Sequence, residues 1–388
     1  MQIARSRLVL VFVVALAVTH LSTWPAAAQR TAAPNSPSIV EVGVQQFVAE
    51  GYDQPAEKAA ALVAKIQKRD RIPGMAAACA IDGKLVWAEG FGLANVELDV
   101  PATPRTRFRV GSISKVLTVG AVAKLVEAGK LDLDAPVQTY VPSFPKKEHP
   151  VTTRQLTGHL AGIRHYLPTD TGDSQHFDDV VDALTIFQDD PLIHPPGSKW
   201  SYSSYAWNLV AAVVQGASGR PFLEFMQQEV FNPLGLDDTC ADQRRKIIPN
   251  RTAFYGRDGD DNLSNLPEID ISYKWAGGGF LSSVEDLVLY GSAYLPGTDF
   301  LKPETLELVF TKQQTNDGIA TRNGIGWAVS KDADGHALYS HGGSLQGCRA
   351  YLLIMPHSRV VVAIAANNRH GVNINLADAL KLARMFAL

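Results

Sequence analysis

The stretch Phe108-Arg109-Val110-Gly111-Ser112-Ile113-Ser114-Lys115 lies where a strand-rich pattern changes to a helical one, and it decides how the rest of the chain is interpreted. Residues 114–130 are apolar nearly all round, with Lys124, Glu127 and Lys130 forming one narrow polar stripe. A helix of this composition is buried on most of its faces. The sequence therefore predicts a core helix whose first turn carries Lys115, directly after Ser112.

The residues before this helix predict an amphipathic helix followed by a hairpin. Residues 57–69 alternate aliphatic residues with lysines at helical spacing. Two apolar runs, 74–81 and 84–88, then flank Asp82-Gly83. An Asp-Gly pair between apolar runs strongly favours a hairpin turn, so we expect two paired strands here.

After the core helix the pattern stays helical and rich in loops to about residue 270, and strands return near the C-terminus. We expect helices near 178–188, 206–216, 221–230, 283–294 and 375–387, and strands at 325–330, 349–355 and 360–366. Strands at both ends with helices between them predict an α+β fold. In it, N- and C-terminal helices flank an antiparallel sheet, and a mainly helical domain is inserted. The sheet domain would be 56–110 plus 271–388 and the helical domain 111–270, with a ligand cleft between them.

Residues 1–28 have the pattern of a secretory signal peptide. Arg5 and Arg7 precede an apolar run, 8–18, which is too short to cross a bilayer that needs about 20 apolar residues. Small residues then permit cleavage after Ala28, although an uncleaved anchor is the alternative. We therefore predict export to the periplasm or the medium, no stable membrane span after cleavage, and an irregular lead-in over 29–55.

The composition is that of a globular, enzyme-sized protein. The chain has 388 residues, 46% of them hydrophobic and 19% charged, and its formal net charge is −3. Such a charge provides no basic face, so we expect no nucleic-acid partner. The three cysteines, Cys79, Cys240 and Cys348, permit one disulfide at most, and a buried free thiol is favoured for each.

Ser112 and Lys115 are the first candidates for chemistry. A serine and a lysine three residues apart on a helix share one face, and a serine hydroxyl needs a neighbouring base to act as a nucleophile. A desolvated lysine near a helix N-terminus can be that base. The spacing alone is weak, because Ser143-Phe144-Pro145-Lys146 repeats it in a loop-like segment. A capping role for Ser112 or Ser114 is the structural alternative.

Two further segments carry candidates. Tyr202 can relay a proton if nearby cations favour its phenolate, or it can simply pack while Ser203 or Ser204 caps the next helix. His341 can orient or protonate a substrate, or it can be a turn histidine, and it precedes the predicted strand 349–355. Gly342 and Gly343 would let a substrate approach closely, and the Ser344 amide could supply an oxyanion donor.

No cofactor or metal site emerges from the sequence. His159 and His165 are six residues apart, which is not a helical metal spacing, and we interpret both as structural. The acidic loop 258–261 lacks the ligand alternation of a calcium site. The glycine before Ser112 has no partnering Gly-Lys-Ser/Thr, so a phosphate-binding loop is not expected.

Three motifs of this chain resemble, in the same order, those of the serine β-lactamase and penicillin-binding-protein superfamily. They are Ser112-x-x-Lys115, Tyr202-x-Ser204 and His341-Gly342-Gly343. The resemblance covers about residues 57–388 and is greatest to class C β-lactamase-related hydrolases. Segments outside the motifs share it: 72–75, 82–87, 90–92, 100–104, 159–163 and 233–236.

The resemblance implies a role for each motif residue. Ser112 would be the acylated nucleophile, Lys115 its activating partner and Tyr202 the proton relay, with His341 at the position where β-lactamases usually carry lysine. The Ser112 and Ser344 amides would form the oxyanion hole, and the contacts to the substrate would come from Ser204, Gly342 and Gly343.

Two departures from the β-lactamase pattern bear on the substrate. Ser204 replaces the usual asparagine, and His341 lacks the permanent charge that binds a substrate carboxylate. We therefore expect a serine hydrolase that acts on a peptide, amide or ester carbonyl of a small molecule or peptide, as a peptidase, esterase or β-lactamase. The alternatives are a penicillin-binding protein and a filament or assembly protein, each with little turnover.

Overall fold

A computed structural model of the protein describes residues 46–170 and 175–387. The predicted signal peptide, residues 1–28, lies outside the described residues. In the part of the lead-in that is described, the structure corrects the prediction of an irregular segment. A short strand, β1 (Gln46–Val48), and the beginning of helix α1 (Asp53–Asp70) both fall before residue 56.

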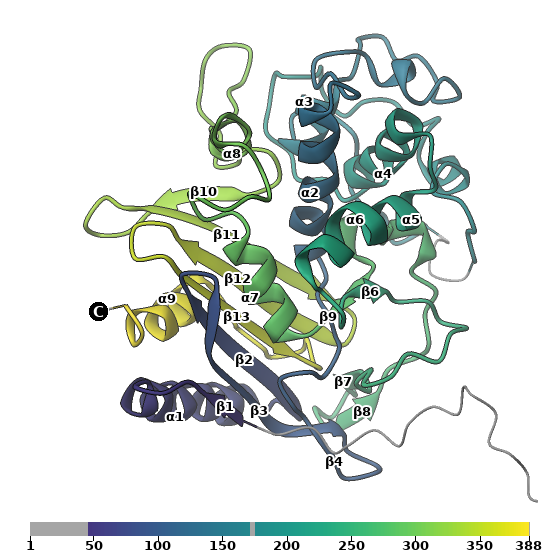
Figure 1. Cartoon of the computed structure of the whole chain (residues 1–388). Coiled ribbons are helices and arrows are strands. Elements are labelled where there is room, and N and C mark those ends of the chain that lie inside the picture. The colour runs from purple at the N-terminus through teal and green to yellow at the C-terminus, as the bar shows by residue number, and fades with distance from the viewer. Residues whose placement is uncertain (1–45, 171–174, 388) are drawn as a thin grey trace, which may run out of the picture. The chain divides into compact units, whose positions relative to one another are not determined.

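Within the described residues the main sheet is antiparallel and has eight strands, in the order β1-β3-β2-β13-β12-β11-β10, with β4 paired to β3 outside this path. Strand β2 pairs with β13, so an N-terminal and a C-terminal strand of the described chain meet in the middle of the sheet (Figure 1). The strands that follow β1 are β2 (Gly74–Ile81), β3 (Lys84–Asn95), β4 (Val100–Pro101), β10 (Ala328–Lys331), β11 (Ala337–Leu345), β12 (Cys348–Met355) and β13 (Val360–Ala366).

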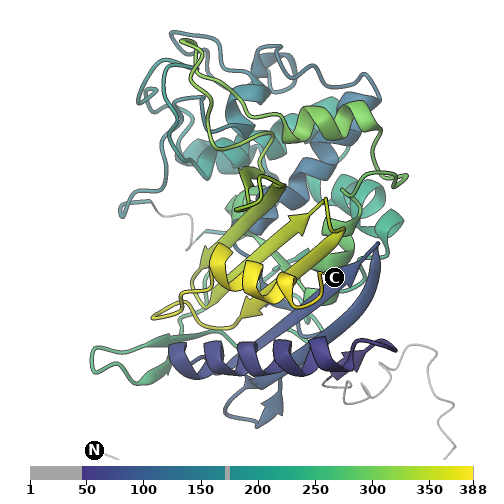
Figure 2. The same cartoon turned by 90° about the vertical axis from the view of Figure 1, so that its left-hand side faces the viewer.

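Helices cover both faces of this sheet. Helices α1 and α9 (Leu376–Arg384) lie on one face, and α7 (Val284–Ser292) lies on the other (Figures 1 and 2). Successive side chains of a strand point to opposite faces. On β13, Val362 packs in the core under α1 and α9, and its neighbour Val361 packs in the core under α7. Apolar side chains are therefore needed at every position of this strand.

The helical part is built around α2 (Ile113–Glu127), most of which is buried. This burial explains the nearly uniform apolar composition of residues 114–130. The elements packed against α2 include α4, α5, α6 and α8. The remaining helices are α3 (Thr153–Thr157), α4 (Tyr205–Ser218), α5 (Phe222–Met226), α6 (Trp275–Gly278) and α8 (Pro303–Phe310).

Two small sheets complete the described part of the chain. One has the order β5-β9-β6 and consists of β5 (Phe108–Arg109), β9 (Phe280–Ser282) and β6 (Cys240–Ala241). The other is the pair β7 (Tyr255–Arg257) and β8 (Leu263–Asn265). Because β5 ends three residues before Ser112, the first of these sheets fixes the start of α2.

The structure corrects two predicted helices. The segment 178–188 forms only a 3₁₀ helix, Asp182–Ile186, because β-branched residues such as Val180, Val181 and Ile186 have low helix propensity. The predicted helix 221–230 is α5, which ends at Met226 and continues as a π-helical turn, Gln227–Phe231. A 3₁₀ turn, Asn232–Leu234, follows directly, and the helical run ends at Gly235, which has a φ of +65°.

The strand predictions also need correction near the C-terminus. The predicted strand 325–330 is β10, which begins three residues later, and the strand β11 was not predicted at all. Gly342 and Gly343 lie inside β11, and glycine has low strand propensity, so the alternating pattern is interrupted there. His341 therefore lies within a strand and not in a turn before one. Helix α8 was also not predicted, although Pro303 at its first position is a helix-start signal.

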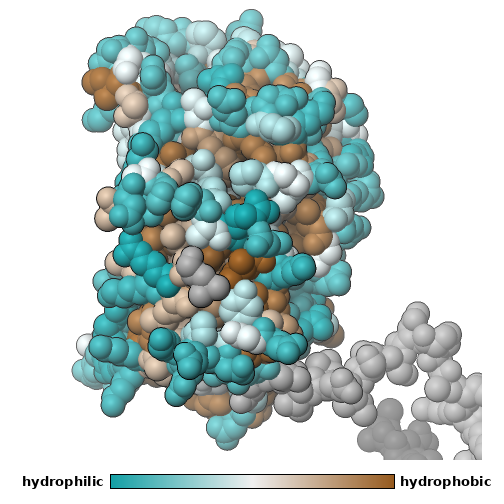
Figure 3. Space-filling view, turned by 60° about the vertical axis from the view of Figure 1, so that its left-hand side comes forward, coloured by the Kyte–Doolittle hydropathy of each residue, from teal (hydrophilic) through white to brown (hydrophobic). Residues whose placement is uncertain are grey.

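The predicted α+β class is confirmed, whereas the division into two domains stays a prediction. The three cysteines are unpaired, and Cys79 and Cys348 are buried. Within the described residues, no helix is both long and apolar enough to span a membrane. On the face that Figure 3 shows, hydrophilic residues cover most of the surface, and apolar side chains appear in separate areas between them.

Candidate active site

The segment that leads to Ser112 is held against two different elements. The Arg109 guanidinium pairs with the buried Asp242 carboxylate at 2.7 Å and donates to the Gln346 carbonyl at 3.2 Å. The Val110 amide donates to the Phe280 carbonyl at 3.1 Å. These contacts tie the start of α2 both to the small sheet and to the β11–β12 turn.

Two glycines allow this segment to lie directly against β11. Gly111 has a φ of +49°, and a β-carbon on it would lie 2.6 Å from the Ser344 amide nitrogen. A β-carbon on Gly343 would lie 1.9 Å from the Val110 carbonyl oxygen. The structure therefore brings Ser112 and Ser344 together, and the Ser112 amide makes no hydrogen bond to another described residue.

Lys115 is fully buried, one turn after Ser112. Its ammonium donates to the Ser112 hydroxyl at 3.2 Å, the Ser204 hydroxyl at 3.0 Å and the Gly277 carbonyl at 2.5 Å. None of these partners is a carboxylate. Burial lowers the pKa of the Lys115 amine, although the Tyr202 phenol favours the charged form and opposes this shift. The neutral form of the amine, which can act as a base, is therefore populated at a lower pH than the neutral form of an exposed lysine.

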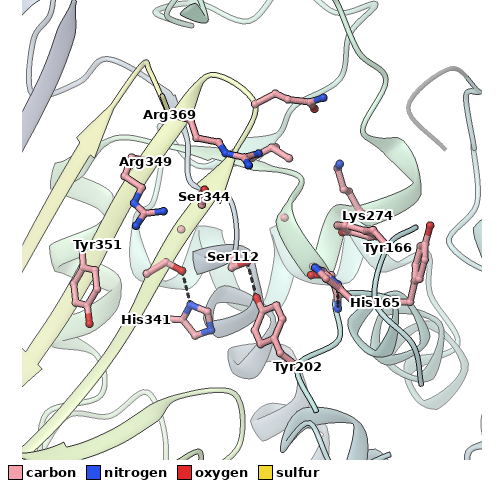
Figure 4. Close-up of a pocket in the computed structure, with 18 of the residues that line it drawn as sticks. Ser112, His165, Tyr166, Tyr202, Lys274, His341, Ser344, Arg349, Tyr351 and Arg369 are labelled. Carbon is pink, nitrogen blue, oxygen red and sulfur yellow. Dashed lines mark hydrogen bonds between the residues drawn. The ribbon is translucent and has the colours of Figure 1, made fainter. Parts of the chain in front are cut away.

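Tyr202 lies on the other side of the same hydroxyl. Its phenol donates to the Ser112 oxygen at 2.7 Å (Figure 4). Burial alone would raise the pKa of this phenol, but the Lys115 ammonium and the hydrogen bonds from nearby side chains lower it below the usual value. Ser112 is thus held between two groups that exchange protons more readily than free lysine and tyrosine do.

His341 projects from β11 into the same cavity. Its Nδ1 donates to the Gly342 carbonyl at 2.8 Å, which leaves Nε2 as the acceptor. Burial and the nearby Lys115 lower the pKa of His341 to about 4, although the bond to Gly342 opposes this shift. The imidazole is therefore neutral at pH 7 and supplies no fixed charge.

The structural alternatives raised by the sequence do not hold for Ser112. It occupies the N-cap position of α2, but its side chain makes no capping hydrogen bond. Ser114 instead accepts a hydrogen bond from the Phe280 amide at 3.1 Å. In the second copy of the spacing, Ser143 and Lys146 are both exposed. Only the first copy has a buried lysine.

The cavity around Ser112 has a volume of about 640 Å³, within the range of small-molecule sites. Its lining includes all four further predicted residues, Ser204, Gly342, Gly343 and Ser344. Ser204 contacts Lys115 and makes no capping hydrogen bond to α4. Next to it, the Ser203 hydroxyl does accept the Ala206 amide at 3.0 Å, as the capping alternative predicts.

The cavity wall also contains charged residues that the sequence did not identify. Arg349 on β12 and Arg369 after β13 lie on the side of Ser344, and Lys274 lies on the opposite side (Figure 4). Neither arginine pairs with a carboxylate within residues 46–170 and 175–387. Only the register of the sheet, which places Arg349 opposite Ser344, could have identified the first of them.

One group of residues in the described chain could hold a metal ion. Ligand atoms of Asp332, Asp334 and His336 lie within 4.8 Å of one another. These residues form the turn between β10 and β11, at the opposite end of β11 from Ser344. The group therefore contributes nothing to the cavity around Ser112.

Comparison with known proteins identifies the family. The sequence profile of the beta-lactamase family matches residues 59–384, which is most of the chain. The chain belongs to the beta-lactamase family. The prediction of a β-lactamase-related serine hydrolase is thereby confirmed at the level of this family.

Relatives within the beta-lactamase family include a mitochondrial protein and a peptidase. The chain is 32% identical to the mouse serine beta-lactamase-like protein LACTB, mitochondrial, over 87% of this chain and 81% of that protein. It is 27% identical to the D-aminopeptidase of Gluconobacter oxydans, over 83% of this chain and 61% of that protein. Among solved structures, the octameric penicillin-binding protein homologue from Pyrococcus abyssi superposes with a TM-score of 0.71 at 25% identity, over 85% of this chain and 76% of that one.

Proposed function

We propose that the protein hydrolyses a peptide, amide or ester carbonyl through an acyl-enzyme on Ser112. The observation that carries this proposal is the position of the Ser112 hydroxyl, which contacts both Tyr202 and Lys115. A serine oxygen attacks a carbonyl only when a neighbouring base removes its proton. Two groups with lowered pKa values in contact with one hydroxyl provide that base.

Acylation begins when the Ser112 oxygen attacks the substrate carbonyl carbon and its proton passes to the Tyr202–Lys115 pair. The carbonyl oxygen takes on negative charge, and the amides of Ser112 and Ser344 would stabilise it. Collapse of the tetrahedral intermediate breaks the bond to the leaving group. That group receives the proton from Tyr202, and an ester of Ser112 remains.

Deacylation repeats these steps with water. The pair formed by Tyr202 and Lys115 takes a proton from the water as its oxygen attacks the ester carbonyl. The bond to the Ser112 oxygen then breaks, and the proton returns to that oxygen. The acid product leaves, and the enzyme regains its starting state. His341, neutral at pH 7, would accept a hydrogen bond from substrate through Nε2.

The size and charge of the cavity favour a short peptide or a small ester that carries an anionic group. The volume of about 640 Å³ accommodates a short peptide or a small ester. Arg349 and Arg369 provide the positive charge that His341 does not. The D-aminopeptidase among the relatives supports peptide or amide substrates.

A fluorophosphonate probe tests the nucleophile directly. We expect the wild type to be labelled and Ser112→Ala to remain unlabelled, with Ser143→Ala as the matched control because Ser143 has the same spacing to a lysine. Equal labelling of wild type and Ser112→Ala would disprove the proposal. Sustained hydrolysis of p-nitrophenyl esters would identify an enzyme that completes many catalytic cycles. A penicillin-binding or assembly protein would release little product in the same assay.

We further propose that the protein is exported after cleavage behind Ala28. The two arginines and the uninterrupted apolar run 8–18 favour a secretory signal over the Arg-rich, amphipathic pattern of mitochondrial leaders. N-terminal sequencing of the protein expressed with its leader tests this. We expect a mature chain that begins at Gln29, and retention of Met1 would contradict cleavage.

A further inference from the structure

The segment that carries Tyr202 is held by two histidines that have no part in the proposed reaction. The carbonyl of His159 accepts the Ser201 amide at 2.8 Å, and its Nδ1 accepts the Ser203 amide at 3.2 Å. One residue therefore binds the backbone on both sides of Tyr202.

His165 extends this arrangement by one residue. Its Nδ1 accepts the Ser204 amide at 3.2 Å. Ser204 in turn contacts Lys115, so the histidine lies two hydrogen bonds away from the amine. Two histidines six residues apart thus act on consecutive amides of a segment that lies about forty residues further along the chain.

Both imidazole rings also contact the Tyr202 ring. The centroid of the His159 ring lies 4.4 Å from that of Tyr202, with an interplanar angle of 35°. The His165 ring lies at 5.5 Å and 79°, which is an edge-to-face contact. The phenol is therefore restrained through its ring as well as through the backbone on either side of it.

The hydrogen bonds define the protonation state of both rings. An Nδ1 atom that accepts a backbone amide must carry a lone pair, so the proton of each neutral ring lies on Nε2. For His159, burial lowers the pKa well below the usual value, and the nearby cation Lys115 lowers it further, as do His341, Arg322 and His165. A neutral ring is thus the state that its surroundings favour.

His159 has two energetically unfavourable features. Its φ is +60°, a left-handed conformation that is uncommon for residues other than glycine. Its Nε2 is buried without a hydrogen-bond partner among the described residues. An unpaired buried polar group destabilises a fold. These two features are consistent with a role for the ring in the site.

We propose that His159 and His165 are positioning residues, which hold the Tyr202 phenol against Ser112 by accepting the amides of Ser203 and Ser204. This inference rests on the proposed function of Tyr202 as the proton relay. It reassigns two histidines that the sequence indicated only as structural.

Matched substitutions separate the Nδ1 contact from a general effect on folding. In His165→Asn the amide oxygen can take the place of Nδ1, whereas in His165→Gln the oxygen reaches the place of Nε2. We expect fluorophosphonate to acylate the asparagine variant at nearly the wild-type rate. The glutamine variant should be slower by about tenfold to 100-fold, with the dissociation constant of p-nitrophenyl acetate in single-turnover kinetics unchanged. Equal rates for the two variants would overturn the proposal.

A double-mutant cycle tests whether the histidine acts through the tyrosine. Positioning predicts that His165→Gln has almost no further effect in a Tyr202→Phe background, because the group being positioned is already absent. Additive losses would overturn the inference but leave the relay intact. A Tyr202→Phe variant with the wild-type acylation rate would overturn the relay and the inference together. The same pair of substitutions at the more deeply buried His159 is included where near-UV circular dichroism shows a native fold.

Discussion

Gly111 and Ser344 approach each other so closely that a β-carbon at position 111 would lie 2.6 Å from the Ser344 amide nitrogen. The two residues come from segments more than two hundred positions apart. Their contact places the turn before Ser112 directly against β11, and it thereby brings together the two backbone amides that we propose for the oxyanion hole. The absence of a side chain at residue 111 is a condition for this arrangement.

Substitution of Gly111 by alanine should therefore reduce acylation strongly. The new methyl group would push β11 away, and loss of one oxyanion donor typically lowers the rate by about 10²- to 10³-fold. Single-turnover kinetics with a p-nitrophenyl ester measures the effect. The matched control is Gly129→Ala, since Gly129 also has a positive φ, +64°, but a β-carbon there would meet no atom within 4 Å. Equal losses of activity in the two variants would show that the backbone conformation, and not the contact with Ser344, is what matters.

Replacement of Lys115 by methionine should separate activity from stability. Methionine fills a similar volume but cannot accept a proton, so we expect acylation to fall by about 10²- to 10⁴-fold. The melting temperature should change little, because removal of a buried amine offsets the lost contacts with Ser204 and Gly277. Lys124→Met, on the same helix but bonded to the Phe300 carbonyl, is the control and should retain activity. An active Lys115→Met variant would contradict the proposed role of the amine.

His341→Lys should shift the pH dependence of acylation. The wild-type imidazole has a pKa of about 4, so it stays neutral through the usual assay range. A lysine at this position adds a positive charge near Lys115, which disfavours the charged form of that amine and lowers its pKa. The acid limb of the pH–rate profile should therefore move to lower pH in His341→Lys and remain in place in His341→Gln. A limb that moves to higher pH in the lysine variant would contradict this account.

The two arginines of the cavity should confer a preference for anionic substrates. A charge-assisted hydrogen bond is worth roughly 1.5–3 kcal/mol, so Arg349→Gln should raise KM about tenfold or more for an ester that carries a carboxylate. The neutral ester of the same size should change by less than about twofold. Lys84→Gln, at the far end of the sheet, controls for net charge. An equal effect on both esters would remove Arg349 from substrate recognition.

Much of the fold was predictable because its main elements have strong local patterns. The strand Val360–Ala366 and the hairpin at Asp82-Gly83 agree with the structure, since continuous apolar runs and a turn dipeptide define them locally. Strand β11 was missed because Gly342 and Gly343 remove its side-chain pattern. Those glycines are present for a close approach that only the folded chain reveals.

The candidate site was predictable only in part. Ser112 and Lys115 are neighbours on one helix, so their spacing in the sequence already implies contact. Tyr202 came from a motif, and its contact with Ser112 joins residues ninety positions apart. Arg349 depends on the register between β11 and β12, for which the sequence carries no local signal. The proposed positioning role of His159 and His165 depends on contacts with a segment about forty residues further along the chain, so the sequence around each histidine does not indicate it.

The pairing of β2 with β13 has a consequence for biosynthesis. Strand β2 lies between β3 and β13, which is the last strand among the described residues, so the centre of the sheet is incomplete until residues 360–366 have left the ribosome. Contacts between such distant segments are slow to form, and the chain would remain unfinished throughout translation. Termination between residues 342 and 359 would remove β13 and leave β2 unpaired on one side. Such a product would lack activity although Ser112, Lys115, Tyr202 and His341 had all been synthesised.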